Sequence, residues 1–340
     1  MNAIARDAGS AVGCVWVEAP ARLHMGFIDL NGDLGRRFGS LGMTLEGIGV
    51  RLRAAPSRSI AASGPGADRA AEYARRLTSA WDLPQSVRLD VEQGIPEHVG
   101  LGSGTQLALA VGAAVARLYG RRTDAREVAQ ITDRGARSGI GIGAFESGGF
   151  IVDGGHAPHE AAPPPVTVRL DVPSDWRVLL VLDRRGQGLH GSRESAAFEA
   201  LPAFPADQAA HISHLLLMQA LPALVHADLP AFGTAVDEIQ RRLGDHFAIA
   251  QGGRFSSSRV ADAMAWLRAR GAVGIGQSSW GPTGFCLVKG AERAQGLAAD
   301  ARRHFRDTPS LAFLDLRPRN AGSRVWQEES AVSRHAGTTA

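Results

Sequence analysis

The segment EHVGLGSGTQLALAVGAAVARL, residues 97–118, contains the feature that decides the fold. Gly100, Gly102 and Gly104 alternate with single residues, and an apolar helical pattern follows at once. A glycine-rich turn that opens a helix binds anions, because its first N–H groups have no partner within the helix and the helix dipole favours negative charge there. The spacing alone leaves two interpretations open: a phosphate-binding loop, or a tight strand-to-helix turn without a ligand.

The loop matches neither of two common nucleotide-binding motifs. It lacks the Gly-Lys-Ser/Thr of a Walker A loop, and its glycine spacing is not that of the dinucleotide fingerprint. In the helix that follows, Leu107, Val111, Ala114 and Leu118 recur at helical spacing. The alanines and glycines of this helix predict close packing against a sheet.

Composition narrows the class of protein. The chain has 340 residues, of which 44% are hydrophobic and 21% charged, and its net charge is +3. This predicts a globular protein of roughly two domains that has no nucleic-acid partner. Lys289 is the only lysine, so we expect charge contacts to phosphate to come from arginine, whose fork suits bidentate binding.

Neither the N-terminus nor the two cysteines suggest export. The N-terminus lacks the apolar segment of a signal peptide, and no apolar run approaches the ~20 residues that span a bilayer. We therefore expect a cytoplasmic protein without a membrane partner. Cys14 and Cys286 lie far apart in apolar, strand-like contexts and are predicted to be core thiols.

Strands and helices succeed one another without regular alternation, which favours an α+β fold over a doubly wound sheet. The patterns predict strands over 15–19, 48–54, 87–91, 150–153, 176–183 and 284–288, and helices over 67–80, 207–227, 229–243 and 258–270. An Ala/Pro-rich stretch at 157–165 is expected to be a linker. This places a domain boundary at about residue 165, between domains of 13–165 and 166–328.

Several segments resemble one known family. PEHVGLGSGTQLALA (96–110) resembles the second motif of the GHMP kinase superfamily. APARLHMGFIDLNGDLGRRFGSLGMTLE (19–46) is similar to the opening of the β-ribofuranosylaminobenzene 5′-phosphate synthase family within that superfamily. Residues 138–155, 188–198 and 276–285 also resemble this family. The resemblance runs from 19 to about 325 and implies a two-domain GHMP-kinase-like fold, with an N-terminal ribosomal-protein-S5-like domain and a C-terminal ferredoxin-like domain.

The departures from true kinases support the synthase family. Gly104 and Thr105 stand where kinases usually have a second serine. Phe145 and Glu146 stand where many kinases have an aspartate base, and 277–282 reads QSSWGP in place of a glycine run. These changes remove expected kinase chemistry, keep an anion cradle and add an aromatic ring.

The resemblance implies a decarboxylating phosphoribosyltransferase of tetrahydromethanopterin biosynthesis. The family condenses phosphoribosyl pyrophosphate with 4-aminobenzoate or 4-hydroxybenzoate to a C-riboside 5′-phosphate, releasing carbon dioxide and pyrophosphate. It also implies Mg²⁺ as cofactor, small-molecule substrates and a homodimer. The sequence does not decide between the amine and the hydroxyl.

Phosphate binding is assigned to two places. The glycine loop would supply backbone donors from Gly100, Leu101, Gly102, Ser103, Gly104 and Thr105. Arg36 and Arg37 would reach a phosphate, with a surface arginine pair as the alternative. Asp29 is the expected catalytic partner of Arg36, either as a tentative Mg²⁺ ligand or as a proton acceptor. A turn-capping aspartate is the alternative for Asp29.

Substrate binding is assigned to aromatic and polar residues elsewhere. Trp280 would form one wall of a slot for the benzoate, with Ser278 and Ser279 as hydrogen-bonding partners. Arg22 and His24 flank Leu23 in strand-like alternation and would face one side of a sheet. Glu146 is a further candidate, and His190 and Arg193 are weaker ones. A packed tryptophan and a structural histidine are the alternatives for Trp280 and His24.

Two other functions fit the same sequence. One is an ATP-dependent small-molecule kinase on the same fold, which nucleotide binding would reveal. The other is a catalytically silent sugar-phosphate-binding protein, which would have no need for a proton acceptor such as Asp29.

Overall fold

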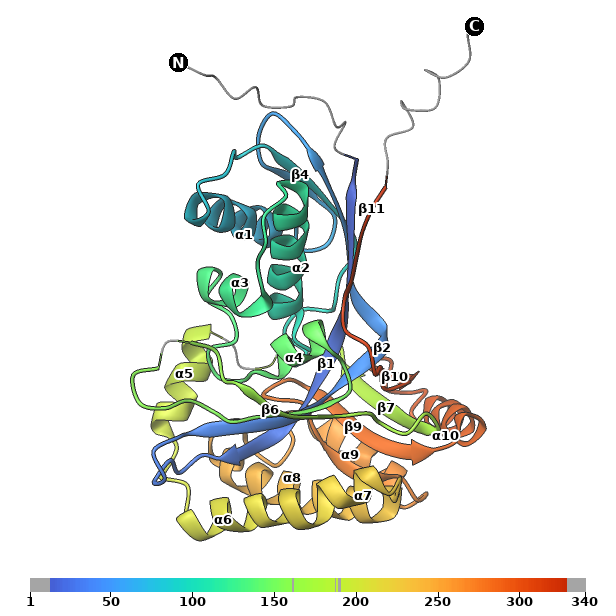
Figure 1. Ribbon diagram of the computed structural model, residues 1–340. Helices are drawn as coiled ribbons and strands as arrows, with labels where there is room; N and C mark the ends of the chain where they lie inside the picture. Colours follow the sequence, from blue (N-terminus) through green and yellow to red (C-terminus); the bar gives the residue numbers. More distant parts are fainter. Residues whose placement is uncertain (1–12, 161, 187, 189–190, 329–340) are drawn as a thin grey trace, which may run out of the picture.

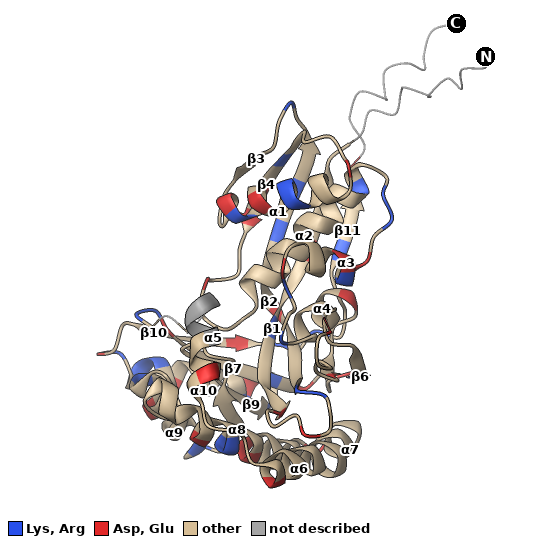
Figure 2. Ribbon diagram, turned by 90° about the vertical axis from the view of Figure 1, so that its left-hand side faces the viewer, with Lys and Arg blue, Asp and Glu red and all other residues tan. Residues whose placement is uncertain are grey.

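The computed structural model describes residues 13–160, 162–186, 188 and 191–328, with the side chains of 191–195 excepted. Their strands form two sheets, with helices packed on both, in an α+β arrangement (Figure 1). On the side seen in Figure 2, acidic and basic residues are interspersed over both sheets and their helices rather than gathered on one face.

The first sheet has seven strands and is built on a long hairpin. Its order is β11-β1-β2-β4-β3, with β5 paired to β2 and β6 paired to β5. Because β2 is 19 residues long, its first half pairs with β5 and its second half with β4. The strands are β1 (Val15–Asp29), β2 (Phe38–Pro56), β3 (Ala61–Ser63), β4 (Val87–Gln93), β5 (Phe150–Asp153), β6 (Val166–Leu170) and β11 (Arg324–Gln327).

Four helices cover this sheet: α1 (Ala67–Ala80), α2 (Ser103–Leu118), α3 (Ala125–Ile131) and α4 (Ile140–Glu146). The helix after the glycine loop, α2, packs on β1 and β2, as its small residues predict. At Gly112 an added Cβ would lie 2.4 Å from a methyl group of Val128, so α2 and α3 approach closely there. Asp124 caps α3 by accepting the Glu127 N–H at 2.8 Å.

The second sheet has the ferredoxin-like order. Its strands are β7 (Trp176–Asp183), β8 (Val273–Gln277), β9 (Thr283–Lys289) and β10 (Leu311–Leu316). They pair antiparallel in the order β10-β7-β9-β8, which is 4-1-3-2 in chain order. Helices α9 (Ser258–Arg268) and α10 (Ala291–His304) pack on this sheet in one apolar cluster.

The remaining helices connect the two sheets. They are α5 (Gly191–Ala200), α6 (Ala206–Leu215), a π-helical turn (Leu216–Ala220), α7 (Leu221–Val225) and α8 (Leu229–Gln251). The long helix α8 lies against both β8 and β1. Its side chains satisfy the free edge of β8: Asp237 accepts the Ile275 N–H at 2.7 Å, and Gln240 accepts the Gln277 N–H at 2.8 Å. Covering an edge in this way removes a site of unwanted strand pairing.

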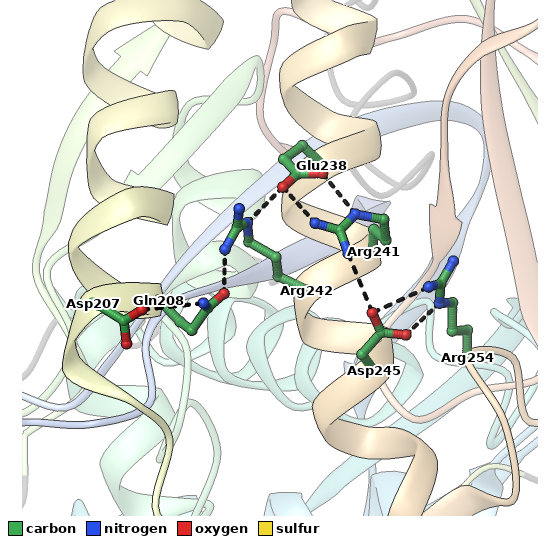
Figure 3. Close-up of polar contacts among 7 residues, drawn as sticks. All are labelled: Asp207, Gln208, Glu238, Arg241, Arg242, Asp245 and Arg254. Carbon is green, nitrogen blue, oxygen red and sulfur yellow. Dashed lines mark hydrogen bonds and ion pairs between the residues drawn. The ribbon is translucent and has the colours of Figure 1, made fainter.

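A network of ion pairs runs along α8 (Figure 3). Glu238 accepts hydrogen bonds from Arg241 and Arg242, which lower its pKa to about 2, the Arg241 bond being the largest cause. Arg241 also contacts Asp245, which is paired in turn with Arg254. Arg242 donates to Gln208 of α6, so the network ties α8 to α6.

Some strand predictions were too short. The pattern of 15–19 is the start of a fifteen-residue strand, and 48–54 lies within β2. The glycines between them did not end the strands, because pairing of β1 with β2 continues from Val15 to Asp29 through two register shifts. The predicted helix 207–227 is interrupted by the π-helical turn, and α8 extends beyond 243.

The domain boundary at about 165 stays a prediction. Two strands beyond it, β6 and β11, pair with β5 and β1 of the first sheet, so the chain returns to that sheet near its end. Cys286 is buried, which raises the pKa of its thiol, but Cys14 is only half-buried and the core prediction for it was wrong. No helix among the described residues is long and apolar enough to span a membrane.

Candidate active site

Three segments that are far apart in the chain meet at residues 22–24 of β1. The Ser278 hydroxyl joins two of them: it accepts the His24 N–H at 3.1 Å and donates to the Gly100 carbonyl at 2.8 Å. Arg22 also donates to the Gly100 carbonyl, and its own N–H donates to the Leu101 carbonyl at 3.2 Å. The structure therefore brings together Arg22, His24, Ser278 and the glycine loop, while their roles in substrate binding stay predictions.

The glycine loop presents the start of α2 to solvent. Gly100 and Gly102 both have φ of +83°, a conformation that favours glycine. The first helical bond of α2 runs from the Gln106 N–H to the Gly102 carbonyl. Because Ser103, Gly104 and Thr105 precede that bond, their N–H groups have no helical partner and can bind an anion.

Two arginines that the sequence analysis missed lie beside this loop. A Cβ added at Gly104 would lie 3.5 Å from the Arg134 guanidinium and 3.7 Å from that of Arg69. Arg69 is paired with Glu97, and both line a cavity of about 180 Å³ next to Ser103. Arg69 comes from α1 and Arg134 from the loop before α4, so no local pattern marks them.

A bulge in β1 places His24 and Phe27 on the same face. Residues three apart on a regular strand face opposite sides, but the register of β1 with β2 shifts between His24 and Gly26. As a result the His24 ring lies 4.8 Å from the Phe27 ring, edge to face. The bulge is held by α8, because Gln240 donates to the Met25 carbonyl at 2.6 Å.

His24 is a buried neutral imidazole. Its exposure is 3%, and burial, with a smaller effect from the charge of Arg22, lowers its pKa from 6.5 to about 3. Within the described part of the chain neither ring nitrogen has a hydrogen-bond partner. A buried polar group without a partner is costly, so the imidazole is available to a ligand that can satisfy it.

Trp280 is surrounded by aromatic rings. It is buried, and its ring lies 4.6 Å from Phe247 of α8 and 5.2 Å from Phe198 of α5. His24, Phe27, Phe247 and Trp280 line a cavity of about 30 Å³, together with Ser279, which has a positive φ of 55°. Trp280 and His24 thus line one cavity, while the assignment of Trp280 as a wall of the benzoate slot stays a prediction.

Asp29, Arg36 and Arg37 lie at the other end of β1. Seven residues separate Arg22 from Asp29, which at ~3.3 Å per residue is about 20 Å along the strand. Asp29 accepts the N–H groups of Asn31 at 2.7 Å and Gly32 at 2.9 Å through one carboxylate oxygen, which is the turn-capping alternative. These three residues are not brought to the glycine loop.

The two arginines at this end already have partners. Arg36 donates to the carbonyls of Gly154 at 2.7 Å and Gly155 at 2.6 Å and pairs with Glu160. Arg37 donates to the Leu30 carbonyl at 3.0 Å, and its guanidinium lies 5.3 Å from the Phe38 ring. Since Phe38 pairs with Asp29 in the sheet, this end of the site combines a carboxylate, an aromatic ring and a cation.

The other candidates are not at this face. Glu146 ends α4 beside α3, where burial, followed by the charge of Asp124, raises its pKa. The groups that act on its carboxyl are Asp124 and Arg126, whereas α4 approaches the glycine loop at its other end, where a Cβ added at Gly141 would lie 2.9 Å from the Thr105 side chain. His190 and the side chain of Arg193 lie outside the described residues.

The described residues contain no group of three His, Cys, Asp or Glu side chains placed to hold a metal ion. Asp29 has one carboxylate oxygen engaged by the turn, and Glu97 at the glycine loop is paired with Arg69. A Mg²⁺ ion that keeps several waters and binds substrate phosphates needs only one or two protein carboxylates, so these residues fit a substrate-bound ion rather than a dedicated metal cage.

The fold and the glycine loop define a protein of the GHMP kinase class. Residues 67–149 match the model of the GHMP kinases N terminal domain, and residues 220–307 match that of the GHMP kinases C terminal domain. Among solved structures, homoserine kinase from Cytophaga hutchinsonii superposes with a TM-score of 0.67 at 17% identity, covering 96% of this chain and all of that one. Mevalonate diphosphate decarboxylase from Staphylococcus aureus superposes with a TM-score of 0.64 at 15% identity, covering 93% of this chain and 98% of that one.

Curated relatives narrow the class further. A protein of Methanothermobacter thermautotrophicus is 35% identical over 301 residues, which cover 80% of this chain and 88% of the relative. One of Archaeoglobus fulgidus is 34% identical over 302 residues, covering 85% and 92%. Both are named β-ribofuranosylphenol 5′-phosphate synthase. The chain belongs to this family of enzymes.

Proposed function

We propose that the protein is a decarboxylating phosphoribosyltransferase that joins phosphoribosyl pyrophosphate to 4-hydroxybenzoate. The products are a C-riboside 5′-phosphate, carbon dioxide and pyrophosphate. The observation that carries the proposal is the arrangement around His24, whose backbone is tied through Ser278 to the anion-binding loop and whose ring contacts Phe27 of the aromatic set. A sugar pyrophosphate and an aromatic acid require these two environments side by side.

The glycine loop is the proposed site of the pyrophosphate. Departure of pyrophosphate from the anomeric carbon leaves oxocarbenium character on the sugar and negative charge on the leaving group. Fixed N–H donors at Ser103, Gly104 and Thr105 would stabilise that charge without reorganising, and Arg69 and Arg134 stand beside them. Arg22 supports the loop from the β1 side through the Gly100 carbonyl.

A bound Mg²⁺ would supply further charge stabilisation on the pyrophosphate. We propose that it arrives with the sugar pyrophosphate and that at most one or two protein carboxylates contact it. Asp29, the predicted ligand, lies about 20 Å along β1 from Arg22 and the glycine loop. Glu97, which is paired with Arg69 beside the loop, is the carboxylate placed to contact this ion.

The aromatic acid attacks through the ring carbon that bears its carboxylate. A carbon–carbon bond forms to the anomeric carbon, and loss of carbon dioxide then returns the bonding pair to the ring and restores aromaticity. A para hydroxyl donates electrons to this attack, and a carboxylate that accepts its hydrogen bond strengthens the donation. We propose that Asp29 accepts this hydrogen bond, with Arg36 and Arg37 orienting the same end of the site.

The hydroxyl is favoured over the amine by the relatives. They are named as synthases of a ribofuranosylphenol 5′-phosphate, a product that retains a phenolic oxygen. A place in tetrahydromethanopterin biosynthesis, a cytoplasmic location and a homodimer stay predictions from the family resemblance.

The test is release of carbon dioxide. Purified protein is incubated with phosphoribosyl pyrophosphate, magnesium and either carboxyl-labelled 4-hydroxybenzoate or carboxyl-labelled 4-aminobenzoate, with and without ATP. We expect label in the trap that depends on the sugar pyrophosphate, does not depend on ATP, and is greater for the hydroxy acid. No release from either acid, together with tight ATP binding, would favour the alternative of an ATP-dependent small-molecule kinase.

A further inference from the structure

The ring of Phe198 is enclosed by four other aromatic rings. Its centroid lies 5.8 Å from Phe27, 5.7 Å from Phe38, 5.9 Å from Phe247 and 5.2 Å from Trp280. The interplanar angles are 80°, 83°, 89° and 87°, so every contact is edge to face. This is the geometry that aromatic pairs prefer, and any phenyl ring in this position would gain it. We call Phe27, Phe38, Phe247 and Trp280 the ring cage.

The cage and its occupant come from different kinds of element. Phe27 and Phe38 belong to the long hairpin β1–β2, Phe247 to α8, and Trp280 to the loop between β8 and β9. These elements are held together by hydrogen bonds of β1 with Ser278 and with Gln240. Phe198 comes from the short helix α5, which lies at the outer edge of the molecule (Figure 1). The cage is thus part of the packed core, whereas its occupant is delivered by a peripheral helix.

Two cations lie next to rings of this cluster, one beside the occupant and one beside the cage. The Arg137 guanidinium lies 5.1 Å from the Phe198 ring, and the Arg37 guanidinium lies 5.3 Å from the Phe38 ring. Guanidinium groups bind aromatic faces and also bind carboxylates through paired donors. An aromatic ring that carries a carboxylate would satisfy both the cage and its rim.

Polar atoms without a hydrogen-bond partner lie in the cage, at Trp280, and beside it, at His24. Trp280 and His24 are each 3% exposed, and within the described chain the Trp280 indole N–H and both His24 ring nitrogens lack hydrogen-bond partners. The cavity that they line holds about 30 Å³, which is room for water but not for a ring. A benzene-sized ligand needs a cavity on the order of 150 Å³, so this cavity cannot hold one. A ligand ring that made the four edge-to-face contacts of the cage would have to take the place of the Phe198 ring.

We propose that the ring cage binds the ring of an aromatic carboxylate, and that Phe198 occupies the cage in the ligand-free protein and is displaced when the acid binds. The class of ligand rests on the proposed function; the displacement of Phe198 rests on the ring geometry. Binding of the acid then competes with an internal ligand, and the apparent affinity is reduced by the fraction of molecules in which Phe198 fills the cage.

The test is calorimetric binding of 4-hydroxybenzoate without the sugar pyrophosphate, so that it reads the cage and not turnover. Phe198→Ala empties the cage, and we expect it to bind the acid several-fold to tenfold more tightly than the unmodified protein. Phe247→Ala removes a wall and should weaken binding by tenfold or more. Phe305→Ala, a half-buried phenylalanine of the second domain, is the matched control and should leave binding unchanged.

The opposite result overturns the proposal. If Phe198→Ala weakens binding as Phe247→Ala does, Phe198 is a wall of the site and not its occupant. If neither the unmodified protein nor Phe198→Ala binds the acid, the cage is not an acid site. Phe198→Leu, a milder change, and a melting curve for each variant guard against misfolding. Failure of the proposed function would be distinguishable from failure of this proposal. In that case the protein would release no carbon dioxide, but its affinity for the acid would still change in these variants as expected.

Discussion

At the scale of single residues, His24 shows how burial selects chemistry. A histidine in water titrates near pH 6.5, but enclosure by β1, α8 and the loop after β8, together with the nearby charge of Arg22, lowers the pKa of His24 to about 3. The imidazole is therefore neutral throughout the physiological range and can both donate and accept a hydrogen bond. A protonated, positively charged His24 would be repelled by the neighbouring Arg22 guanidinium.

The first prediction concerns this pKa. Because the folded pKa of His24 lies below the unfolded value, the unfolded state takes up the proton first as the pH falls. His24 therefore costs no stability above about pH 6.5, and the free energy of unfolding should decline between pH 6.5 and 3, by up to about 4 kcal/mol in total. Urea unfolding at several pH values measures it. His24→Gln should flatten this part of the curve, and an equal slope in both proteins would contradict the assignment.

The second prediction concerns Asp29. In Asp29→Asn the amide oxygen can still accept the N–H groups of Asn31 and Gly32, so the turn and the melting temperature should be preserved. The amide is a poor proton acceptor and metal ligand, so we expect carbon dioxide release to fall by about 100-fold or more. Binding of the sugar pyrophosphate should survive. Asp33→Asn, at an exposed position of the same loop, is the control, and an unchanged rate in Asp29→Asn would end its catalytic assignment.

The third prediction concerns the arginines at the glycine loop. Arg69→Gln and Arg134→Gln each remove a cation that stands beside the N-terminus of α2. We expect each to raise the KM for phosphoribosyl pyrophosphate roughly tenfold, a loss typical of one charge-assisted hydrogen bond, with little effect on the KM for the aromatic acid. Arg58→Gln, an exposed arginine of the first domain, should change neither constant. If the substitutions raised both KM values equally, the two arginines would not act specifically on the sugar pyrophosphate.

At the scale of elements, the site depends on how closely the glycine loop meets the loop after β8. Ser278 bridges the His24 N–H and the Gly100 carbonyl, and a Cβ added at Gly100 would lie 2.2 Å from the Ser278 carbonyl oxygen. The loop thus needs glycine at this position for two reasons, a positive φ and a close backbone approach.

The fourth prediction separates these two reasons. Gly100→Ala and Gly35→Ala both place a Cβ at positive φ, 83° and 88°, but no atom lies within 4 Å of the Cβ position at Gly35. Gly35→Ala should therefore cost only the conformational strain of about 1–2 kcal/mol. Gly100→Ala should cost clearly more and should also weaken binding of the sugar pyrophosphate, as measured by unfolding and by calorimetry. Similar losses in both variants would mean that the contact with Ser278 is unimportant.

At the scale of the whole molecule, the two sheets are joined through β1 and α8. Gln240 of α8 bonds both the Met25 carbonyl of the first sheet and the Gln277 N–H of the second. The chain also returns to the first sheet at its end, where β11 pairs with β1 and Trp326 stacks on Trp16 at 6.0 Å. Neither sheet can separate without breaking these contacts.

The fifth prediction follows from that connection. The protein should unfold in one transition, with circular dichroism and tryptophan fluorescence giving the same midpoint. Ser278→Ala removes the hydrogen bonds that tie the loop after β8 to β1 and to the glycine loop. It should lower the free energy of unfolding by about 1–3 kcal/mol while the single transition is kept. Two separated transitions in the unmodified protein would show that the sheets are independent units.

The sequence by itself determined the family, the α+β class and the glycine loop, because each of these depends on local patterns: residues 97–118 carry their own turn and helical period. It also predicted that Arg22 and His24 share a face, since alternation along a strand is local. Only the tertiary structure decided that Arg69 and Arg134 flank the loop, that Asp29 lies about 20 Å along β1 from Arg22, and that Phe198 fills a cage of four rings. The physical reason is that these contacts join α1, α5, α8 and two hairpin strands, whose mutual positions are set by packing of their apolar faces. In addition, a bulge near Met25 reversed the alternation of side chains between the two faces that a regular strand would have kept.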